Sequence, residues 1–385
     1  MAELGADLFH PVTRDRTSPF IYSDRLGYEL KRFASIEAPD DDGILRLEQL
    51  NSDGFRGREY AVPKPGGIFR IIAVGDSVVQ SLSVSYSRTW EQVLERMLNR
   101  YVAERNMNRR FEVINAGIGG YVSWQVLSRL KDRVLKYQPD LVLVLVGWND
   151  LIFSSLASWT PGTDLSKFEQ AYREMSPHHS MEKSGWLRRE FLRYSYVARL
   201  AREARNRLWN AHRIGRLISQ RQRASGVAFN EQALGIYLRN LERIYEATTA
   251  SGARMGLILW PTLLTAGQLD DTDLHRRLLV TYSNFPLSTG ELWNWYTKYI
   301  EAQRQFVVAH RSDILLIDAA AAFADNDNKA RLKLFSDLAH LTVDGNIMLA
   351  EVLAQKLVKR DVTGWERDWE EKHLTRIPDV SYSVN

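Results

Sequence analysis

The chain has 385 residues, of which 45% are hydrophobic and 25% charged, as is ordinary for a globular protein with a large core. The absence of cysteine excludes disulfides, thiol nucleophiles and cysteine-based metal sites. No apolar run approaches the roughly 18 residues that span a membrane, and the N-terminus lacks the apolar core of a signal peptide. We therefore expect a soluble chain. Its compartment is left open, since an upstream anchor, if one was removed, would make it periplasmic or membrane-associated.

The net charge of +4 is unevenly distributed along the chain. Residues 183–223 carry twelve Lys or Arg and two Glu, a local balance of +10, so the remainder sums to −6. One interpretation is a solvated helix face. The alternatives are a surface attracted to anionic membrane lipid or to anionic polysaccharide. No nucleic-acid partner is expected, because no known binding module is present.

In chain order, a polar N-terminal extension over residues 1–60 comes first, and we expect it to be irregular. A main domain over residues 61–360 follows, in which apolar runs alternate with segments of helical spacing. Several of the runs are continuously apolar, as in strands that are covered on both faces. Strands that alternate with helices predict a parallel α/β sheet with right-handed crossovers. The predicted strands are 68–74, 111–116, 141–147, 254–260 and 313–318.

Helical spacing of apolar residues is found over 90–98, 126–135 and 238–245. More than 100 residues separate the third and fourth predicted strands, far more than a crossover needs. We interpret residues 155–228 as a mainly helical insertion, a candidate lid. A smaller insertion is expected over 262–288, and the tail 361–385 is expected to pack back on the domain.

Polar or glycine-rich residues follow each of the first three strands, and a fourth polar block lies late in the chain, just ahead of an expected helix. Ligands bind at the carboxyl ends of strands in open α/β sheets, so these blocks are candidate site elements. In chain order the blocks are Gly75-Asp76-Ser77, Asn115-Ala116-Gly117-Ile118-Gly119-Gly120-Tyr121, Gly147-Trp148-Asn149-Asp150 and Asp337-Leu338-Ala339-His340.

The residue types in these blocks are those that acyl transfer requires. A serine hydroxyl such as Ser77 becomes a nucleophile when a base removes its proton, and the imidazole of His340 has a suitable pKa. A carboxylate three residues away, Asp337, could orient that imidazole. Glycine-loop N–H groups and the Asn149 amide could bind the oxyanion. Asp76 and Asp150 are expected to bond loop N–H groups.

Each block alone also has an ordinary interpretation, since Gly-Asp-Ser and Gly-x-Asn-Asp occur as simple turns. The Gly117–Gly120 loop differs from a dinucleotide-binding loop, because residue 122 is Val where that pattern needs Gly, so no nucleotide cofactor is expected. The pair His178-His179 has no evident third ligand, so no metal site is expected. What favours catalysis is the occurrence of all four blocks in one order.

That order resembles the SGNH/GDSL hydrolase superfamily, which is named for Ser, Gly, Asn and His in four separate blocks. Here the first block continues with Val78 where the family name has Leu. The resemblance covers about residues 65–150 and 230–357 and leaves the insertion unmatched. A second, looser similarity, of the stretch FRGREYAVPKPGGIFRIIAVGDS, is to bacterial members that carry an upstream membrane segment and act in the cell envelope.

The resemblance implies a three-layer α/β/α sandwich with a mainly parallel five-stranded, flavodoxin-like sheet, and hydrolysis of carboxylic esters. It implies that Ser77 attacks, that His340 is the base and then the acid, and that Asp337 orients it. It places the oxyanion among the Ser77 N–H, the Gly120 N–H and the Asn149 amide. Trp148 and Trp260, at two strand ends, are candidate walls of the substrate pocket.

Three functions therefore remain open at the level of sequence. The first is an esterase that acts on short acyl esters, such as acetyl esters of a carbohydrate. The second is an O-acyltransferase in which a sugar hydroxyl replaces water at the same triad. The third is a carbohydrate- or envelope-binding protein that uses this scaffold without catalysis.

Overall fold

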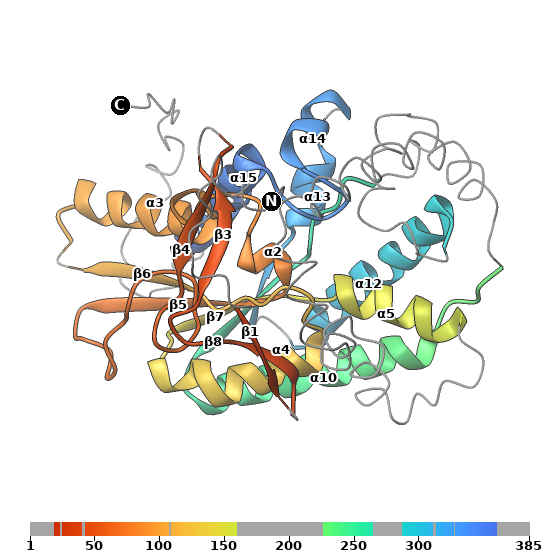
Figure 1. Ribbon diagram of the computed structural model, residues 1–385, viewed down its shortest axis with the longest axis horizontal. Coiled ribbons are helices and arrows are strands. Elements are labelled where there is room, and N and C mark those ends of the chain that lie inside the picture. Colours follow the sequence, from red (N-terminus) through yellow and green to blue (C-terminus); the bar gives the residue numbers. More distant parts are fainter. Residues whose placement is uncertain are drawn as a thin grey trace, which may run out of the picture.

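The computed structural model describes residues 19–23, 25–40, 43–107, 109–159, 226–264, 287–310, 313–326 and 328–359. Its central element is a five-stranded sheet in which all neighbouring strands are parallel (Figure 1). In chain order the strands are β5 (Ile68–Gly75), β6 (Arg110–Asn115), β7 (Leu141–Leu145), β8 (Arg254–Ile258) and β9 (Ile314–Ile317). Each lies within or overlaps one predicted run, so the predicted parallel α/β fold is confirmed.

Burial on both faces explains why these runs are continuously apolar. Every residue of β7 and all but the first residue of β5 are buried. Helices α3 (Trp90–Glu104) and α15 (Val343–Lys359) lie on one side of the sheet, and α4 (Ser123–Arg129) and α10 (Glu231–Ala250) lie on the other (Figure 1). The result is the expected three-layer α/β/α arrangement.

The helices follow the predicted spacing with two differences. The helix expected over 126–135 is split, because α4 passes into a π-helical turn η2 (Leu130–Val134) and then a 3₁₀ turn η3 (Leu135–Tyr137). A long helix not predicted from the sequence, α12 (Thr289–Ala309), begins at a capping box formed by Ser288 and Glu291. The other helices are α2 (Ser77–Gln80), η1 (Tyr86–Arg88), α5 (Trp148–Trp159), α13 (Ala319–Ala324) and α14 (Asn328–Leu334).

The order of the strands determines where a site can form. It is β6-β5-β7-β8-β9, so the chain moves outward from β5 first to one neighbour, β6, and then to the other, β7. In doubly wound sheets a crevice forms at such a switch point, beyond the carboxyl ends of the strands. The segments that follow β5, β6 and β7 therefore converge at one edge of the sheet.

The N-terminal extension is not irregular as predicted. Its described part forms two antiparallel two-stranded sheets, built from β1 (Phe20–Ser23), β2 (Gly27–Leu30), β3 (Ser35–Pro39) and β4 (Leu45–Gln49). The strands are short and only partly buried, which weakened their apolar pattern in the sequence. Inward-facing side chains such as Tyr28 and Leu30 join the main core.

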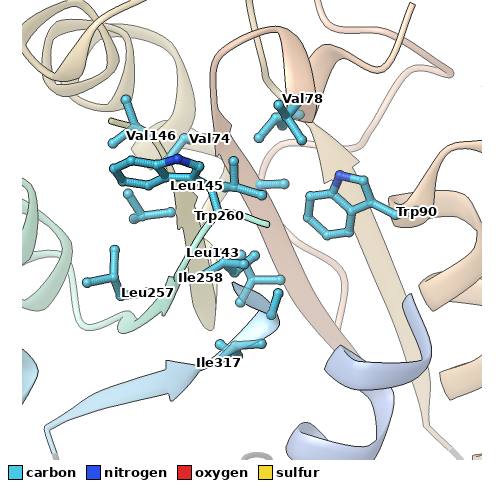
Figure 2. Close-up of a cluster of buried hydrophobic side chains, with 14 of the residues drawn as sticks. Val74, Val78, Trp90, Leu143, Leu145, Val146, Leu257, Ile258, Trp260 and Ile317 are labelled. Carbon is cyan, nitrogen blue, oxygen red and sulfur yellow. The ribbon is translucent and has the colours of Figure 1, made fainter. Parts of the chain in front are cut away.

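One continuous core fills the space around the sheet. Figure 2 shows part of it, with the indoles of Trp90 and Trp260 separated by side chains of the central strands. Both indoles are almost completely buried.

Several predictions lie wholly or largely outside the described residues. They are the insertion over 155–228 with its basic segment 183–223, the His178-His179 pair, the insertion over 262–288 and the tail 361–385. They stay predictions. Within the described ranges, no helix has both the length and the apolar character needed to cross a membrane.

Candidate active site

Ser77 follows the carboxyl end of strand β5, which lies between β6 and β7, and is the first residue of the short helix α2. Asp76 caps that helix, since its Oδ1 accepts a 2.9 Å hydrogen bond from the Val78 N–H. The first N–H groups of a helix have no partner inside the helix, so the Ser77 N–H has none within α2. Ser77 is only partly buried, which leaves its hydroxyl group within reach of a ligand.

Gly75, the last residue of β5, lies closely against the backbone of β7. A Cβ atom at this position would lie 2.0 Å from the carbonyl oxygen of Leu145 on β7 and 2.5 Å from a methyl group of Val79. The carbonyl contact involves backbone, so no side-chain rotation could relieve it. A residue without a side chain is therefore required where β5 and β7 run side by side.

His340 reaches Ser77 from a loop 263 residues further along the chain. Its Nε2 lies 2.8 Å from the Ser77 Oγ, and its Nδ1 lies 2.6 Å from Oδ2 of Asp337. A carboxylate can only accept hydrogen bonds, so Nδ1 carries the proton and the neutral ring presents Nε2 as an acceptor to the serine hydroxyl. The three groups thus form a continuous hydrogen-bonded chain.

The turn between Asp337 and His340 is held by the same carboxylate. Oδ1 of Asp337 accepts hydrogen bonds of 2.9 Å from the Ala339 N–H and 2.8 Å from the His340 N–H. A bond between the Ser336 N–H and the His340 carbonyl closes the loop just before α15. The spacing of three residues therefore lets one carboxylate fix both the backbone and the ring.

The electrostatics of this pair favour a charged form of each partner. Burial alone would raise the pKa of Asp337, but the hydrogen bond and charge of His340 outweigh it, and the pKa is lowered. Burial alone would lower the pKa of His340, but the hydrogen bond and charge of Asp337 raise it above its ordinary value of 6.5. The imidazolium that forms when His340 takes a proton is thereby stabilised.

The glycine loop after β6 packs directly against α2. A Cβ atom on Gly119 would lie 3.6 Å from the Cβ of Ser77, and the Gly119 N–H donates a 2.8 Å hydrogen bond to Oε1 of Gln80. Gly120 has a φ of +82°, in the region that favours glycine. The backbone of this loop therefore lies beside the serine.

Asn149 approaches from the other neighbour of β5, at the start of α5. Its Nδ2 donates to the Tyr121 carbonyl at 3.0 Å and makes a longer contact of 3.4 Å with Oδ2 of Asp76. The structure thus brings blocks one and four into direct hydrogen-bond contact, and connects blocks two and three through Tyr121 and Asn149.

Two buried carboxyl groups support these loops, as expected from the sequence. Asp150 accepts hydrogen bonds from the Ser123 N–H at 3.0 Å and the Ser123 hydroxyl at 2.6 Å, and Asn240 donates to the same hydroxyl at 2.9 Å. Burial raises the pKa of Asp76 to about 6 and that of Asp150 to about 7, and the charge of Asp76 adds to the second shift. Their expected role in bonding loop N–H groups is confirmed.

Trp148 and Trp260 are 3% and 1% exposed and belong to the hydrophobic core. The Trp260 ring lies so close to Gly147 that a Cβ there would be 2.3 Å from Cζ3 of the indole. Both indoles contact the ring of Tyr296, at centroid distances of 6.4 and 5.9 Å. This packing gives Trp260 a structural reason to occupy a strand end, and the role of the two indoles as pocket walls stays a prediction.

The sequence did not reveal two residues that contact the glycine loop, Gln80 and Tyr28. Gln80 lies three residues after Ser77, which places both side chains on one face of a helix, and this spacing was the only sign in the sequence that Gln80 lies near the serine. Tyr28 is 91 residues away from the carbonyl oxygen it contacts, that of Gly119, and belongs to no motif. Among the described residues, no group of three or more His, Asp and Glu side chains is placed to hold a metal ion.

Residues 73–346, more than two thirds of the chain, match the GDSL-like lipase/acylhydrolase family. A search of curated proteins found no match. Similar solved structures include an acetyl xylan esterase (16% identity, TM-score 0.41, covering 74% of this chain and 97% of that one). A second is a lipase/acylhydrolase from Enterococcus faecalis (16% identity, TM-score 0.41, covering 76% of this chain and 96% of that one). A third is an acetylxylan esterase from Geobacillus stearothermophilus (14% identity, TM-score 0.40, covering 75% of this chain and 93% of that one).

Proposed function

Because the chain belongs to the GDSL-like lipase/acylhydrolase family and is an ester hydrolase, we propose that it cleaves carboxylic esters through an acyl-enzyme on Ser77. The observation that carries this proposal is the hydrogen-bonded chain from Ser77 through His340 to Asp337, with distances of 2.8 and 2.6 Å. Its members are reachable, since the side chains of His340 and Asp337 are 26% and 17% exposed.

In the first half-reaction, Nε2 of His340 takes the proton of the Ser77 hydroxyl while Oγ attacks the ester carbonyl carbon. The carbonyl π electrons move to oxygen and give a tetrahedral oxyanion. When the intermediate collapses, the bond to the alcohol oxygen breaks, and that oxygen takes the proton from His340. The acyl group remains bound to Ser77 and the alcohol departs.

The second half-reaction repeats the sequence with water as the nucleophile. His340 takes a proton from water, the hydroxide attacks the acyl carbon, and the bond to Ser77 breaks as Oγ recovers the proton. Asp337 keeps the ring oriented throughout by accepting the hydrogen bond of Nδ1–H. The carboxylic acid is released and the enzyme is regenerated.

Three donors would stabilise the oxyanion, namely the Ser77 N–H, the Gly120 N–H and the Asn149 amide. The position of Ser77 at the start of α2 and the packing of the glycine loop against it support the first two. For Asn149, the support is an amide held by the Tyr121 carbonyl, while its contact with Asp76 is long enough at 3.4 Å to give way to an anion.

The proposed substrates are esters of short acyl groups, with a small molecule or a carbohydrate as the alcohol. The buried state of Trp148 and Trp260 supports a short acyl group, because their indoles occupy core volume beside the strand ends. A series of p-nitrophenyl esters from acetyl to decanoyl tests this directly. The ratio kcat/KM is expected to fall as the acyl chain lengthens, and a maximum at long chains would contradict the short-acyl proposal.

The nucleophile is tested with Ser77→Ala and with a fluorophosphonate probe that labels activated serines. Turnover of p-nitrophenyl acetate and labelling should both be lost, while the thermal unfolding temperature is retained. Ser87→Ala, which alters an exposed serine of η1, serves as the matched control and should behave like the wild type. If Ser77→Ala kept its activity, the proposed acyl-enzyme would be wrong.

A further inference from the structure

Tyr28 brings the N-terminal region into contact with the glycine loop. It lies on β2, is 2% exposed, and its hydroxyl donates a 2.7 Å hydrogen bond to the carbonyl oxygen of Gly119. The same hydroxyl is so close to Gly120 that a Cβ there would be 2.6 Å from it. Residue 28 lies outside the range 73–346 that matches the family and Gly119 lies inside it, so this contact joins the matched region to a part of the chain that precedes it.

Several contacts fix Tyr28 in this position. The Tyr121 hydroxyl donates a 2.8 Å hydrogen bond to the Tyr28 carbonyl, and the two rings pack edge to face with centroids 5.3 Å apart. Nearby, Nε2 of Gln125 donates to the carbonyl of Leu26 at 2.6 Å. On its other side, the Tyr28 ring meets Phe20 of β1 at 5.5 Å. The phenol is thus a fixed donor.

The Gly119 carbonyl and the Gly120 N–H are the two ends of one peptide group. In a trans peptide these two bonds point in opposite directions, so holding the carbonyl on one side directs the N–H to the other. The Gly119 N–H is itself bonded to Gln80, which fixes the preceding peptide group. Gly120 has no Cβ and a φ of +82°, so its peptide needs such external restraint to keep one orientation.

A hydrogen bond received at the carbonyl also polarises the peptide group. Linked hydrogen bonds of this kind strengthen one another inside a protein, where the dielectric is low. The N–H on the far side consequently becomes a better donor. Both effects matter most when negative charge develops in front of that N–H.

We propose that Tyr28 is a positioning residue for the oxyanion hole, whose hydrogen bond to the Gly119 carbonyl aims and strengthens the Gly120 N–H. This inference rests on the proposed function, because it requires Gly120 to be an oxyanion donor. Tyr28 does not touch the reacting atoms; it acts through the Gly119–Gly120 peptide.

The test compares wild type, Tyr28→Phe, Tyr60→Phe and Ser77→Ala with p-nitrophenyl acetate. Tyr28→Phe is expected to lower kcat about three- to tenfold, the usual effect of one neutral hydrogen bond, and to leave KM unchanged. An arylboronic acid, which forms a tetrahedral adduct with the serine, should bind more weakly by the same factor. A ground-state competitor such as acetate should bind equally well.

Tyr60→Phe is the matched control, since it also removes the hydroxyl of a largely buried tyrosine. The Tyr60 hydroxyl lies 3.3 Å from the hydroxyl of Tyr86 and does not contact the glycine loop. It should retain wild-type kcat and boronate affinity. Equal losses in the two Phe variants would overturn the proposal, as would wild-type kcat in Tyr28→Phe while Ser77→Ala is inactive. An active Ser77→Ala would instead overturn the proposed function.

A second pair of variants keeps the proposal testable if Tyr28→Phe does not fold. Replacement of Tyr28 by 4-aminophenylalanine retains a donor at the same position, and replacement by 4-methylphenylalanine retains the size without the donor. The amino variant should have the higher kcat and the tighter boronate binding. Equal values for the two would overturn the positioning role.

Discussion

Glu91, in the first turn of α3, is a fully buried acid whose protonation should control stability between pH 5 and 8. Burial raises its pKa from the ordinary value of 4.5 to about 8, because neither carboxylate oxygen has a hydrogen-bond partner and the charge of Arg56 offsets only part of the cost of burial. We predict that Glu91→Gln stabilises the protein at alkaline pH and has little effect in acid.

The magnitude follows from linkage between protonation and folding. Because the pKa of Glu91 is higher in the folded than in the unfolded state, the stability associated with its protonated form is complete below about pH 4.5. It is lost as the pH rises to about 8, at about 1.4 kcal/mol per pH unit, which sums to about 5 kcal/mol. Glutamine cannot ionise and therefore avoids this loss.

Urea unfolding followed by circular dichroism at pH 5, 7 and 8.5 measures the effect. The difference in unfolding free energy between Glu91→Gln and wild type should grow with pH, and other titrating groups cancel in that difference. Glu104→Gln, at an exposed position near the end of the same helix, is the control and should show no growing difference. A gap between Glu91→Gln and wild type that stays constant with pH would refute the reasoning.

Three further predictions concern the site. Asp337→Asn should lower kcat on p-nitrophenyl acetate by about 10³- to 10⁴-fold, and a harmless substitution would contradict its orienting role. In the proposed mechanism the neutral form of His340 is the base, and Asp337 raises its pKa against the effect of burial. In a pH–rate profile, kcat/KM should therefore rise with pH, and the midpoint of the rise should lie above pH 6.5. Asp337→Asn should shift that midpoint to lower pH. Gly75→Ala should cost about 3 kcal/mol of stability in thermal unfolding, since its Cβ would meet the Leu145 carbonyl at 2.0 Å; an unchanged melting temperature would show that β5 and β7 can separate.

The sequence was sufficient to predict the sheet and the contact between Asp337 and His340 because both depend on local patterns. Continuous apolar runs mark strands that are buried on two faces, and β7 with its five buried residues is a clear case. Asp337 and His340 are three residues apart, so their contact is also local. Their contact with Ser77 could be inferred only from the order of the blocks, which resembles a known family.

The features that were missed depend on distant contacts or on weak patterns. The strands of the N-terminal extension have four or five residues each and β4 is almost entirely exposed, so the alternation in β2 and β3 is too short to be a strong signal in the sequence. The bond from Tyr28 to the glycine loop joins residues that are far apart and share no motif. The burial of Trp260 could not be distinguished from a pocket wall, because an indole at a strand end suits both roles.

The N-terminal extension contacts the candidate active site at a second point, which gives its hairpins a role beyond covering the core. Arg56 is 2% exposed and donates to the carbonyls of Gln80 and Ser81 at 2.9 and 2.6 Å, at the end of the helix that begins with Ser77. It is also paired with Glu48 of β4 at 2.6 Å. Removing a buried charge partner of this kind leaves the other polar groups unpaired, which costs more than the pair itself contributes. Tyr28 likewise donates to a backbone carbonyl, that of Gly119, so residues that precede the range matching the family bond to both α2 and the glycine loop.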